Sequence, residues 1–321
     1  YLGGMSSSLP EDVQHAMYKT VPGLEHAKIV RNAYAIEYDC INPQQLYPTL
    51  EFKKIRGLFS GGQFNGSSGY EEAACQGLVA GINASMEVLG KKQIIIDRSQ
   101  GYIGVLIDDL VTKENHEPYR MMTSRAEYRL LLRQDNADQR LTPLGYEVGL
   151  ISGERYQALL RKIEQIRQEK ERLEKTMVGA NSSVQAFLKN HNSTELRTAV
   201  SLAEILRRPE MTYAYLKEID KDRPDLPEDV AEQAEIDIKY DGYIRRQLKQ
   251  VEQFRKLEQK RIPEDLDYEK IPSLRLEAVQ KLKLCKPISI GQASRISGVS
   301  PADLSVLLVY LEQRKRQERK P

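Results

Sequence analysis

The chain has 321 residues, of which 29% are charged and 40% hydrophobic, with 20 glycines and 14 prolines. This length predicts about two domains, and the composition excludes a disordered or low-complexity chain. No apolar run reaches the ~18 residues needed to cross a bilayer, so we expect no membrane span. The net charge of +2 is uneven, because residues 1–150 hold 15 Lys+Arg against 18 Asp+Glu and residues 271–321 hold 10 against 4. The basic end weakly favours an anionic partner.

The cysteines and histidines argue against metal binding and disulfide bonding. Cys40, Cys75 and Cys285 are far apart and in no C-x-x-C spacing, and the four histidines are scattered. An odd number of separated cysteines is typical of a reducing compartment. We therefore expect a cytoplasmic protein without a metal site.

Residues 1–96 have the texture of a mixed α/β domain. The chain starts at Tyr1, not Met, and its first residues are typical of a domain interior, so we expect the C-terminal part of a longer protein. Ser8 followed by Glu11 predicts a capping-box start of a helix that ends near residue 21. Short apolar or alternating runs predict strands, and these lie at residues 27–31, 34–38, 57–60 and 93–96.

From residue 97 onward nearly every segment has helical periodicity. Two long, charged helices are predicted at about 153–177 and 226–261, with a possible division near 222–226. The helix-start signals are Thr142-Pro143, Ser152, Ser201 with Glu204, Thr212, Ser273, Ser289 and Ser300-Pro301. The predicted fold is α/β followed by all-α, with domains at 1–96 and 97–321.

A glycine-rich turn within residues 57–84 is the most informative segment. An apolar run leads into four glycines, and a helix opens near Tyr70; the glycines are Gly61, Gly62, Gly66 and Gly69. Glycines let a backbone lie close to a ligand, and a helix N-terminus favours a negative group. Gln63 and Asn65 are the polar side chains best placed to hydrogen-bond a heterocycle.

The same turn also has a purely structural interpretation, because glycine-rich strand-to-helix turns are common in α/β domains. No G-x-G-x-x-G occurs in the chain, so the usual dinucleotide fingerprint is missing. Glu71 and Glu72 would repel a pyrophosphate, which favours a less charged part of a cofactor at this helix. Small residues spaced along the helix would let it pack closely against a sheet or a flat group, and these are Ala73, Gly77, Ala80, Gly81 and Ala84.

An arginine series follows. Arg125, Arg129 and Arg133 are spaced by four and are predicted to line one face of a helix that starts near Ser124. Guanidinium groups suit phosphate oxygens. Internal pairing is the competing interpretation, since carboxylates are interspersed among the arginines; these are Glu127, Asp135 and Asp138.

Two C-terminal segments have weaker signals. Residues 289–304 have a helix-turn-helix pattern, but the helix predicted at 300–311 is apolar on nearly all sides, which favours docking over groove reading. Tyr240, Tyr243 and Arg246 could face RNA, although we prefer a core role for the two aromatic residues.

The glycine-rich segment resembles the GidA/MnmG family. The resemblance continues through residues 97–110 and 117–130 and through Ile290-Gly-Gln-Ala-Ser-Arg, and it covers nearly the whole chain. It implies the C-terminal part of a glutathione-reductase-like FAD-binding domain followed by a helical domain. In that family the turn is the second FAD contact, which implies cofactor-binding roles for Gly61, Gly62, Gln63, Asn65, Gly66, Tyr70 and Glu71.

The resemblance also implies a function. The family acts with the GTPase MnmE to add a (carboxymethyl)aminomethyl group to C5 of the wobble uridine of tRNA, using FAD, NADH and methylene-tetrahydrofolate. It implies a homodimer, tRNA contacts at Arg120, Arg125, Arg129 and Arg133, and MnmE contacts at Arg295, Leu304 and Leu308. The family's catalytic cysteine and first FAD motif would lie before Tyr1, so this chain holds no predicted catalytic residue and alone should be inactive. The alternative is a non-catalytic nucleic-acid or protein docking module.

Overall fold

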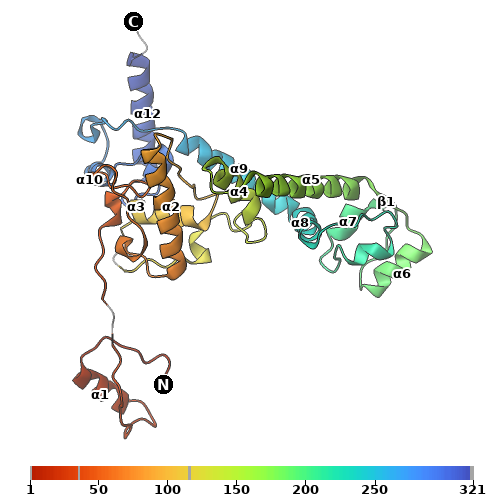
Figure 1. Cartoon of the computed structure of the whole chain (residues 1–321), viewed down its shortest axis with the longest axis horizontal. Coiled ribbons are helices and arrows are strands. Elements are labelled where there is room, and N and C mark those ends of the chain that lie inside the picture. Colours follow the sequence, from red (N-terminus) through yellow and green to blue (C-terminus); the bar gives the residue numbers. More distant parts are fainter. Residues whose placement is uncertain (1, 35–36, 115–116, 319–321) are drawn as a thin grey trace. The chain divides into compact units, whose positions relative to one another are not determined.

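The computed structural model describes residues 2–34, 37–114 and 117–318. The chain divides into two compact units, residues 1–41 and 42–321 (Figure 1). The described residues are mostly helical, and their one two-stranded sheet pairs β1 (Met177–Val178) antiparallel with β2 (Val200–Ser201). Among the described helices, none is both long enough and apolar enough to span a bilayer.

The first unit is built around α1 (Glu11–Lys19). The Gln14 side chain is buried and fixes the returning chain, because it donates to Ala33 O at 3.0 Å and accepts from Ala33 N at 2.9 Å. The predicted capping box is wrong, since the N-cap is Pro10 and no side chain caps the helix. The strand predicted at 27–31 is also absent from the described part of this unit, while the one at 34–38 includes residues 35–36, which lie outside that part.

The second unit begins with η1 (Pro43–Gln45), η2 (Gly62–Asn65) and α2 (Tyr70–Val88). The strand predicted at 57–60 is reduced to an isolated bridge between Glu51 and Phe59. The strand predicted at 93–96 does not form. Its backbone is satisfied instead by a side chain of α2, because Asn83 donates to Ile94 O and accepts from Ile94 N.

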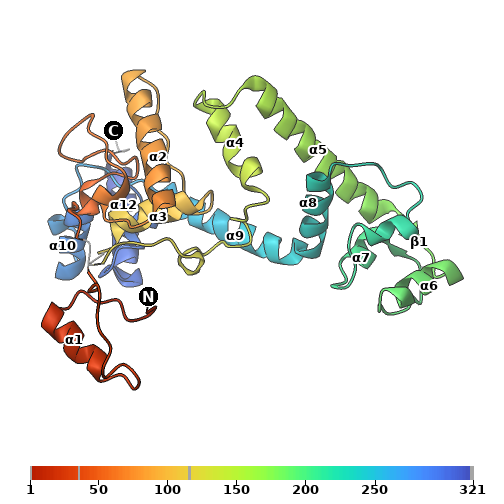
Figure 2. The ribbon, with the colours of Figure 1, turned by 60° about the horizontal axis from the view of Figure 1, so that its bottom comes forward.

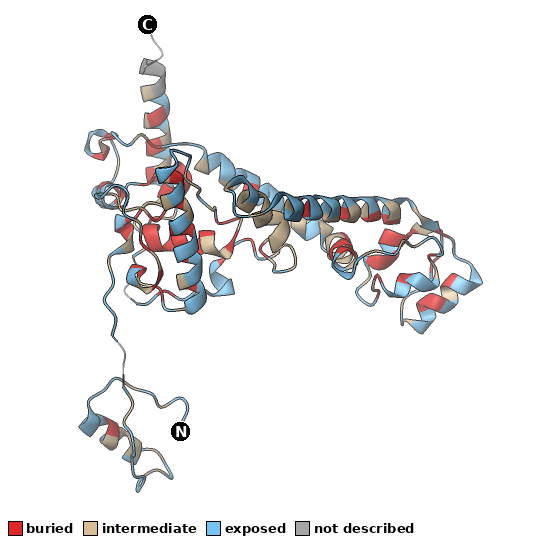
Figure 3. Ribbon diagram, viewed as in Figure 1, coloured by how far each residue is buried: buried red, intermediate tan, exposed pale blue. Residues whose placement is uncertain are grey.

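Helix α3 (Tyr102–Thr112) is the buried helix of this part of the unit. Most of its residues lie in the interior, and Figure 3 colours it red along most of its length. Its close packing depends on Gly104, where an added Cβ would lie 2.3 Å from Asp97 O. The short turn η3 (Thr123–Arg125) follows.

The middle of the chain forms a helical region around α5 (Gly153–Lys175). Helix α5 contacts α4 (Ala137–Glu147), α7 (Leu202–Leu206) and α8 (Glu228–Lys239) (Figure 2). The region also holds α6 (Ser182–Asn190) and η4 (Tyr215–Glu218).

The start signals of this region are partly confirmed. Ser152 caps α5, and Ser201 with Glu204 forms the predicted capping box of α7. Thr142-Pro143 is wrong as a start because it lies inside α4. Thr212 accepts a hydrogen bond from Tyr215 N at 3.4 Å but is not the N-cap of η4, which is Ala214.

The C-terminal part contains α9 (Asp241–Glu258), η5 (Tyr268–Lys270), α10 (Leu276–Cys285), α11 (Ile290–Ala293) and α12 (Pro301–Glu318). The apolar side chains of η5, α10, α11 and α12 share one hydrophobic cluster over residues 262–311. The helix predicted at 226–261 is interrupted at Tyr240, which separates α8 from α9.

The caps predicted at Ser289 and Ser300 are confirmed, since each side chain accepts from the backbone N–H three residues on. Ser273 is wrong as a start, because α10 begins at Leu276 after the N-cap Arg275. The predicted domain boundary at residues 96 and 97 stays a prediction.

Candidate functional site

The glycine-rich turn has backbone geometry that only glycine adopts easily. Gly62 and Gly66 have φ values of +81° and +80°, in the left-handed region. Gly61 is extended, but an added Cβ would lie 3.0 Å from Gly77 N on α2. The turn therefore needs glycine both for its conformation and for its close approach to the helix.

Buried hydrogen bonds of two side-chain amides stabilise this turn. Asn65 donates to Ser60 O at 3.1 Å and to Gln76 Oε1 at 2.9 Å, and it accepts from Ser60 Oγ at 2.6 Å. Gln76 in turn donates to Ser67 Oγ at 2.7 Å. Asn65 is fully buried, and its amide stabilises the conformation of the turn. It is therefore not available to a heterocycle, contrary to the expectation from the sequence.

The start of α2 is open. Its N-cap Gly69 provides no side-chain cap, Tyr70 is 93% exposed, and Glu71 is exposed. Glu72 is buried instead and accepts from Met121 N at 2.9 Å, so it does not face a ligand. The uncapped N–H groups of this first turn are suited to bind an acceptor group.

The small residues of α2 divide between two faces. Ala80 is buried, whereas Gly77 and Gly81 are exposed and an added Cβ at either would meet no atom within 4 Å. Gln63 is half-buried and its side chain makes no hydrogen bond within the described residues. Gly77 and Gly81 thus leave one side of α2 uncovered within the described residues.

Residues 119–136, which hold the four arginines and are called the arginine segment below, do not form the predicted helix. Residues 126–136 are turns and irregular backbone after η3, and burial alternates along them. Ala126 and Tyr128 are buried, whereas Arg125 and Arg129 are exposed. No helix forms here because alternate side chains pack inward, Ala126 against Val105 of α3 and Tyr128 against Phe254 of α9.

The four arginines differ in their contacts. Arg120 donates to Ser68 O at 2.8 Å, and the Arg125 guanidinium lies 4.3 Å from the Tyr119 ring centroid. Arg129 has no hydrogen bond or ion pair within the described residues. Arg133 is only 17% exposed and pairs with Asp135 at 3.0 Å, so internal pairing holds for this arginine.

The turn and the arginine segment are joined by backbone hydrogen bonds. Tyr119 N donates to Gly66 O at 2.7 Å, and Ser68 N donates to Tyr119 O at 3.0 Å. These bonds form a short parallel bridge between Ser67 and Tyr119. The open turn and the exposed arginines therefore lie side by side, although about fifty residues separate them in sequence.

A buried ion cluster supports this junction. The Arg98 guanidinium, 2% exposed, lies 2.6 Å from Asp109, 3.1 Å from Asp108 and 2.7 Å from Glu127. Burial raises the pKa of Asp109, but the charge of Arg98 and hydrogen bonds from neighbouring donors outweigh it and lower that pKa. The sequence analysis assigned no role to Arg98. A pair of acids, Asp108 and Asp109, within the otherwise apolar helix at 102–112 could have indicated a buried cationic partner.

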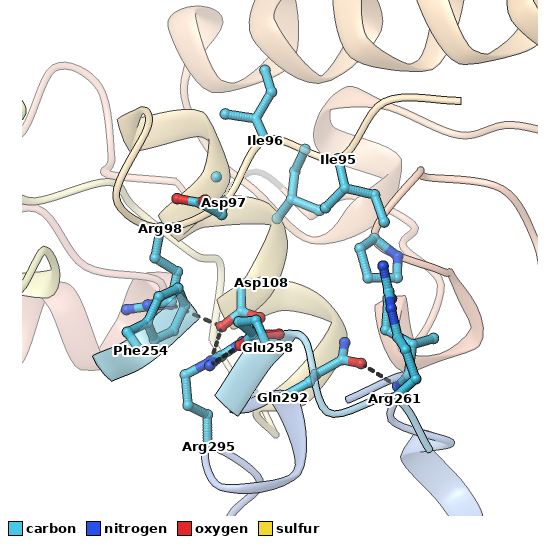
Figure 4. Close-up of a pocket in the computed structure, with 14 residues that line it drawn as sticks. Ile95, Ile96, Asp97, Arg98, Asp108, Phe254, Glu258, Arg261, Gln292 and Arg295 are labelled. Carbon is cyan, nitrogen blue, oxygen red and sulfur yellow. Dashed lines mark hydrogen bonds and ion pairs between the residues drawn. The ribbon is translucent and has the colours of Figure 1, made fainter. Parts of the chain in front are cut away.

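The cluster extends to Arg295, for which a partner contact was predicted. Arg295 lies 2.6 Å from both Asp108 and Glu258 and lines a cavity of about 190 Å³ (Figure 4). Its charge is therefore committed to internal ion pairs. Leu304 and Leu308 are half-buried against the C-terminal hydrophobic cluster. Their contact with a partner stays a prediction.

The core role preferred for Tyr240 and Tyr243 is wrong. Tyr240 is 45% exposed and Tyr243 is 61% exposed, and Arg246 is also exposed. The interruption at Tyr240 changes which side chains of the predicted long helix can face inward.

Of the cysteines, Cys40 and Cys75 are exposed and Cys285 is buried, and no group of three metal-ligating side chains occurs among the described residues.

Comparison with known families gives three matches. Residues 1–92 match the model described as glucose inhibited division protein A. Residues 153–248 match the C-terminal helical domain of the tRNA modifying enzyme MnmG/GidA, and residues 250–321 match its C-terminal helical bundle.

Relatives resemble the whole chain. It is 68% identical over 318 residues to the tRNA uridine 5-carboxymethylaminomethyl modification enzyme MnmG of Lachnoclostridium phytofermentans, covering 99% of this chain and 51% of the relative. The MnmG of Caldicellulosiruptor saccharolyticus is 64% identical over 98% of this chain and 50% of its own length. A crystal structure of Aquifex aeolicus GidA matches with a TM-score of 0.79 and 48% identity, covering 95% of this chain and 48% of that one. The chain therefore spans about half the length of the relatives it matches.

Proposed function

Because this chain belongs to the GidA/MnmG family and comprises the end of its FAD domain followed by its C-terminal helical domains, we propose that it works as part of a tRNA-modifying flavoenzyme. The proposed reaction, carried out with the GTPase MnmE, adds a (carboxymethyl)aminomethyl group to C5 of the wobble uridine. The activity belongs to the full-length protein, and the chain alone is proposed to be inactive.

The observation that carries this proposal is the junction between the glycine turn and the arginine segment. The bonds of Tyr119 to Gly66 and Ser68 hold the predicted flavin contact beside exposed arginines. A flavoenzyme that modifies an RNA base needs a flavin site and a phosphate-binding surface next to each other. The base must reach the cofactor while the neighbouring phosphates are held by the protein.

The residues proposed to hold FAD lie in the glycine-rich turn and at the start of α2. Gly61, Gly62 and Gly66 would let the backbone approach the ring, and Gln63 would hydrogen-bond it. Tyr70 and Glu71 lie at the open start of α2, next to the face formed by Gly77 and Gly81. When bound, FAD supplies the redox chemistry. No residue of this chain is proposed to be catalytic.

Partners are proposed at the level of surfaces. Arg120, Arg125 and Arg129 are exposed and would neutralise tRNA phosphates. The C-terminal bundle, with Leu304 and Leu308, would meet MnmE. We further propose a cytoplasmic homodimer that uses NADH and methylene-tetrahydrofolate.

The test uses the full-length protein. Gly77→Val places a branched side chain on the open face of α2, and it should remove the flavin absorbance that survives gel filtration. Gly153→Val at the start of α5, also with no atom within 4 Å of an added Cβ, is the matched control and should retain flavin. Nucleoside mass spectrometry of tRNA from cells carrying each variant then reports the wobble modification. A wild-type protein without flavin would favour the docking-module alternative.

A further inference from the structure

Helix α9 exposes an aromatic and cationic face that no function assigned above uses. Tyr240 immediately precedes the helix, and Tyr243 and Arg246 follow within its first two turns. Two other cations on α9 are paired, Arg245 with Asp241 and Lys256 with Glu252. Arg246 has no hydrogen bond or ion pair within the described part of the chain. Its charge is therefore available to a ligand.

This face adjoins the arginine segment. Gln247 Nε2 lies 3.5 Å from Glu127 O, and Phe254 packs edge-on against Tyr128 with 6.1 Å between ring centroids. Tyr243 lies one turn before Gln247 on the same side of α9. Helix α9 therefore lies along residues 127 and 128 of the arginine segment, with the Tyr243 ring exposed on the same side.

We propose that Tyr240, Tyr243 and Arg246 form a stacking platform for unpaired nucleotides of the RNA substrate. The exposed tyrosine rings would stack on bases, and Arg246 would contact a flanking phosphate. This inference rests on the proposed function. It assumes that RNA binds at the arginine segment and adds the residues that hold its unpaired bases.

The chemistry of the face favours single-stranded RNA. Bases inside a duplex are stacked on one another and cannot lie on a protein ring, whereas loop bases can be splayed out. The two exposed tyrosine rings offer flat faces to splayed bases, and the guanidinium of Arg246, unpaired within the described residues, offers a cation to the phosphate backbone. Leu248 is the other large exposed apolar residue of this part of α9 among the described side chains, and its position five residues after Tyr243 puts it on a different face.

The experiment measures binding of the full-length protein to two fluorescent probes, an RNA hairpin with an unpaired loop and a blunt duplex of the same stem. Tyr243→Leu should weaken hairpin binding roughly tenfold and leave duplex binding within about twofold. Tyr243→Phe keeps the ring and should bind as the wild type does. Arg246→Gln should lower the slope of hairpin affinity against salt by about one charge.

Matched controls lie away from the platform. Tyr146 on α4 is exposed to the same degree as Tyr240 and stacks on Tyr156, and Arg161 on α5 is exposed. Tyr146→Leu and Arg161→Gln should leave hairpin binding unchanged. Retained flavin and unchanged circular dichroism identify variants that are folded.

The outcomes separate this inference from the proposed function. A wild-type protein that binds neither probe contradicts both. Wild-type binding that Tyr243→Leu and Arg246→Gln leave intact overturns the platform alone. An equal loss for hairpin and duplex in Tyr243→Leu also overturns it, because stacking on unpaired bases cannot explain weaker duplex binding.

Discussion

Asp108 lies between two arginines that are 197 residues apart in sequence, with one carboxylate oxygen 3.1 Å from Arg98 Nη1 and 2.6 Å from Arg295 Nε. Arg98 also binds Glu127 of the arginine segment, and Arg295 binds Glu258 at the end of α9. Asp108 thereby connects the arginine segment, through α3, to the C-terminal bundle. Removal of its charge leaves two largely buried guanidinium groups undercompensated.

Asp108→Asn should therefore lower the free energy of unfolding by about 3 kcal/mol, since one partner of a buried ion pair is removed. Urea denaturation of the same preparation measures this loss. Glu164→Gln, which breaks the exposed pair of Glu164 with Arg167, should cost far less, because solvent screens that pair. Equal costs for the two variants would contradict a structural role for Asp108.

Lys53 predicts a pH dependence of stability. Its ammonium donates to Gln44 O at 2.7 Å and to Cys285 O at 2.5 Å, where α10 ends. Burial lowers the pKa of Lys53 to about 8 from 10.5, with the charge of Lys286 acting in the same direction and Cys285 opposing it. Between these pH values the unfolded chain keeps a proton that the folded chain has released. The contribution of this group to stability therefore rises with pH.

The variant Lys53→Met isolates this contribution. The wild type should gain stability relative to Lys53→Met as the pH rises from 7 to 10, by at most about 3 kcal/mol. Urea denaturation across this pH range measures the difference. Lys283→Met on α10, which replaces a more exposed lysine, controls for the change in net charge. A difference that stays constant, or that falls with pH, would show that Lys53 is not destabilised by its burial.

Arg129 and Arg133 should behave differently despite their regular spacing. Arg129→Gln should weaken tRNA binding by the full-length protein and lower its salt slope by about one charge, because this arginine is exposed and has no pairing in the described residues. Arg133→Gln should lower thermal stability and leave the slope unchanged, because it loses the contact with Asp135. Fluorescence titrations at several salt concentrations, with thermal melts, separate the two effects. A lowered slope in Arg133→Gln would indicate that its internal pair opens on binding.

Gly104→Ala tests the packing of α3. Its Cβ would lie 2.3 Å from Asp97 O and 2.5 Å from Ile96 O, so backbone must move, and we expect a loss of at least about 2 kcal/mol. Gly153→Ala adds the same methyl group where no atom lies within 4 Å and should change stability by less than about 1 kcal/mol. Chemical denaturation compares the two. A mild effect at Gly104 would mean that this contact readily relaxes.

Some interactions between residues close in sequence were predictable, although the helix starts predicted at Ser8, Thr142 and Ser273 were wrong. Ser152, Ser201, Ser289 and Ser300 each cap a helix as expected, because the side chain binds a backbone N–H only three residues away. The glycine turn followed by a helix at Tyr70 was also correct. Such signals need no knowledge of the rest of the fold.

Features that depend on distant residues were missed. The spacing of Arg125, Arg129 and Arg133 suggested a helix, but Ala126 and Tyr128 pack against separate elements, and the segment forms turns and irregular backbone. Nothing local indicated that Asn83 would satisfy Ile94, or that Arg98 and Arg295 would share Asp108. Periodicity describes one element at a time, whereas these contacts join elements.

Tyr119 is held at three points, since its amide and carbonyl bond the glycine turn and its hydroxyl donates to Asp109 at 2.8 Å. The backbone that precedes Arg120 and Arg125 is thus anchored before any ligand arrives. An RNA that binds there would contact a backbone that is already ordered. No loop would have to become ordered on binding, which reduces the entropic cost of association. Selectivity would then come from how well the shape of the incoming strand matches a rigid surface.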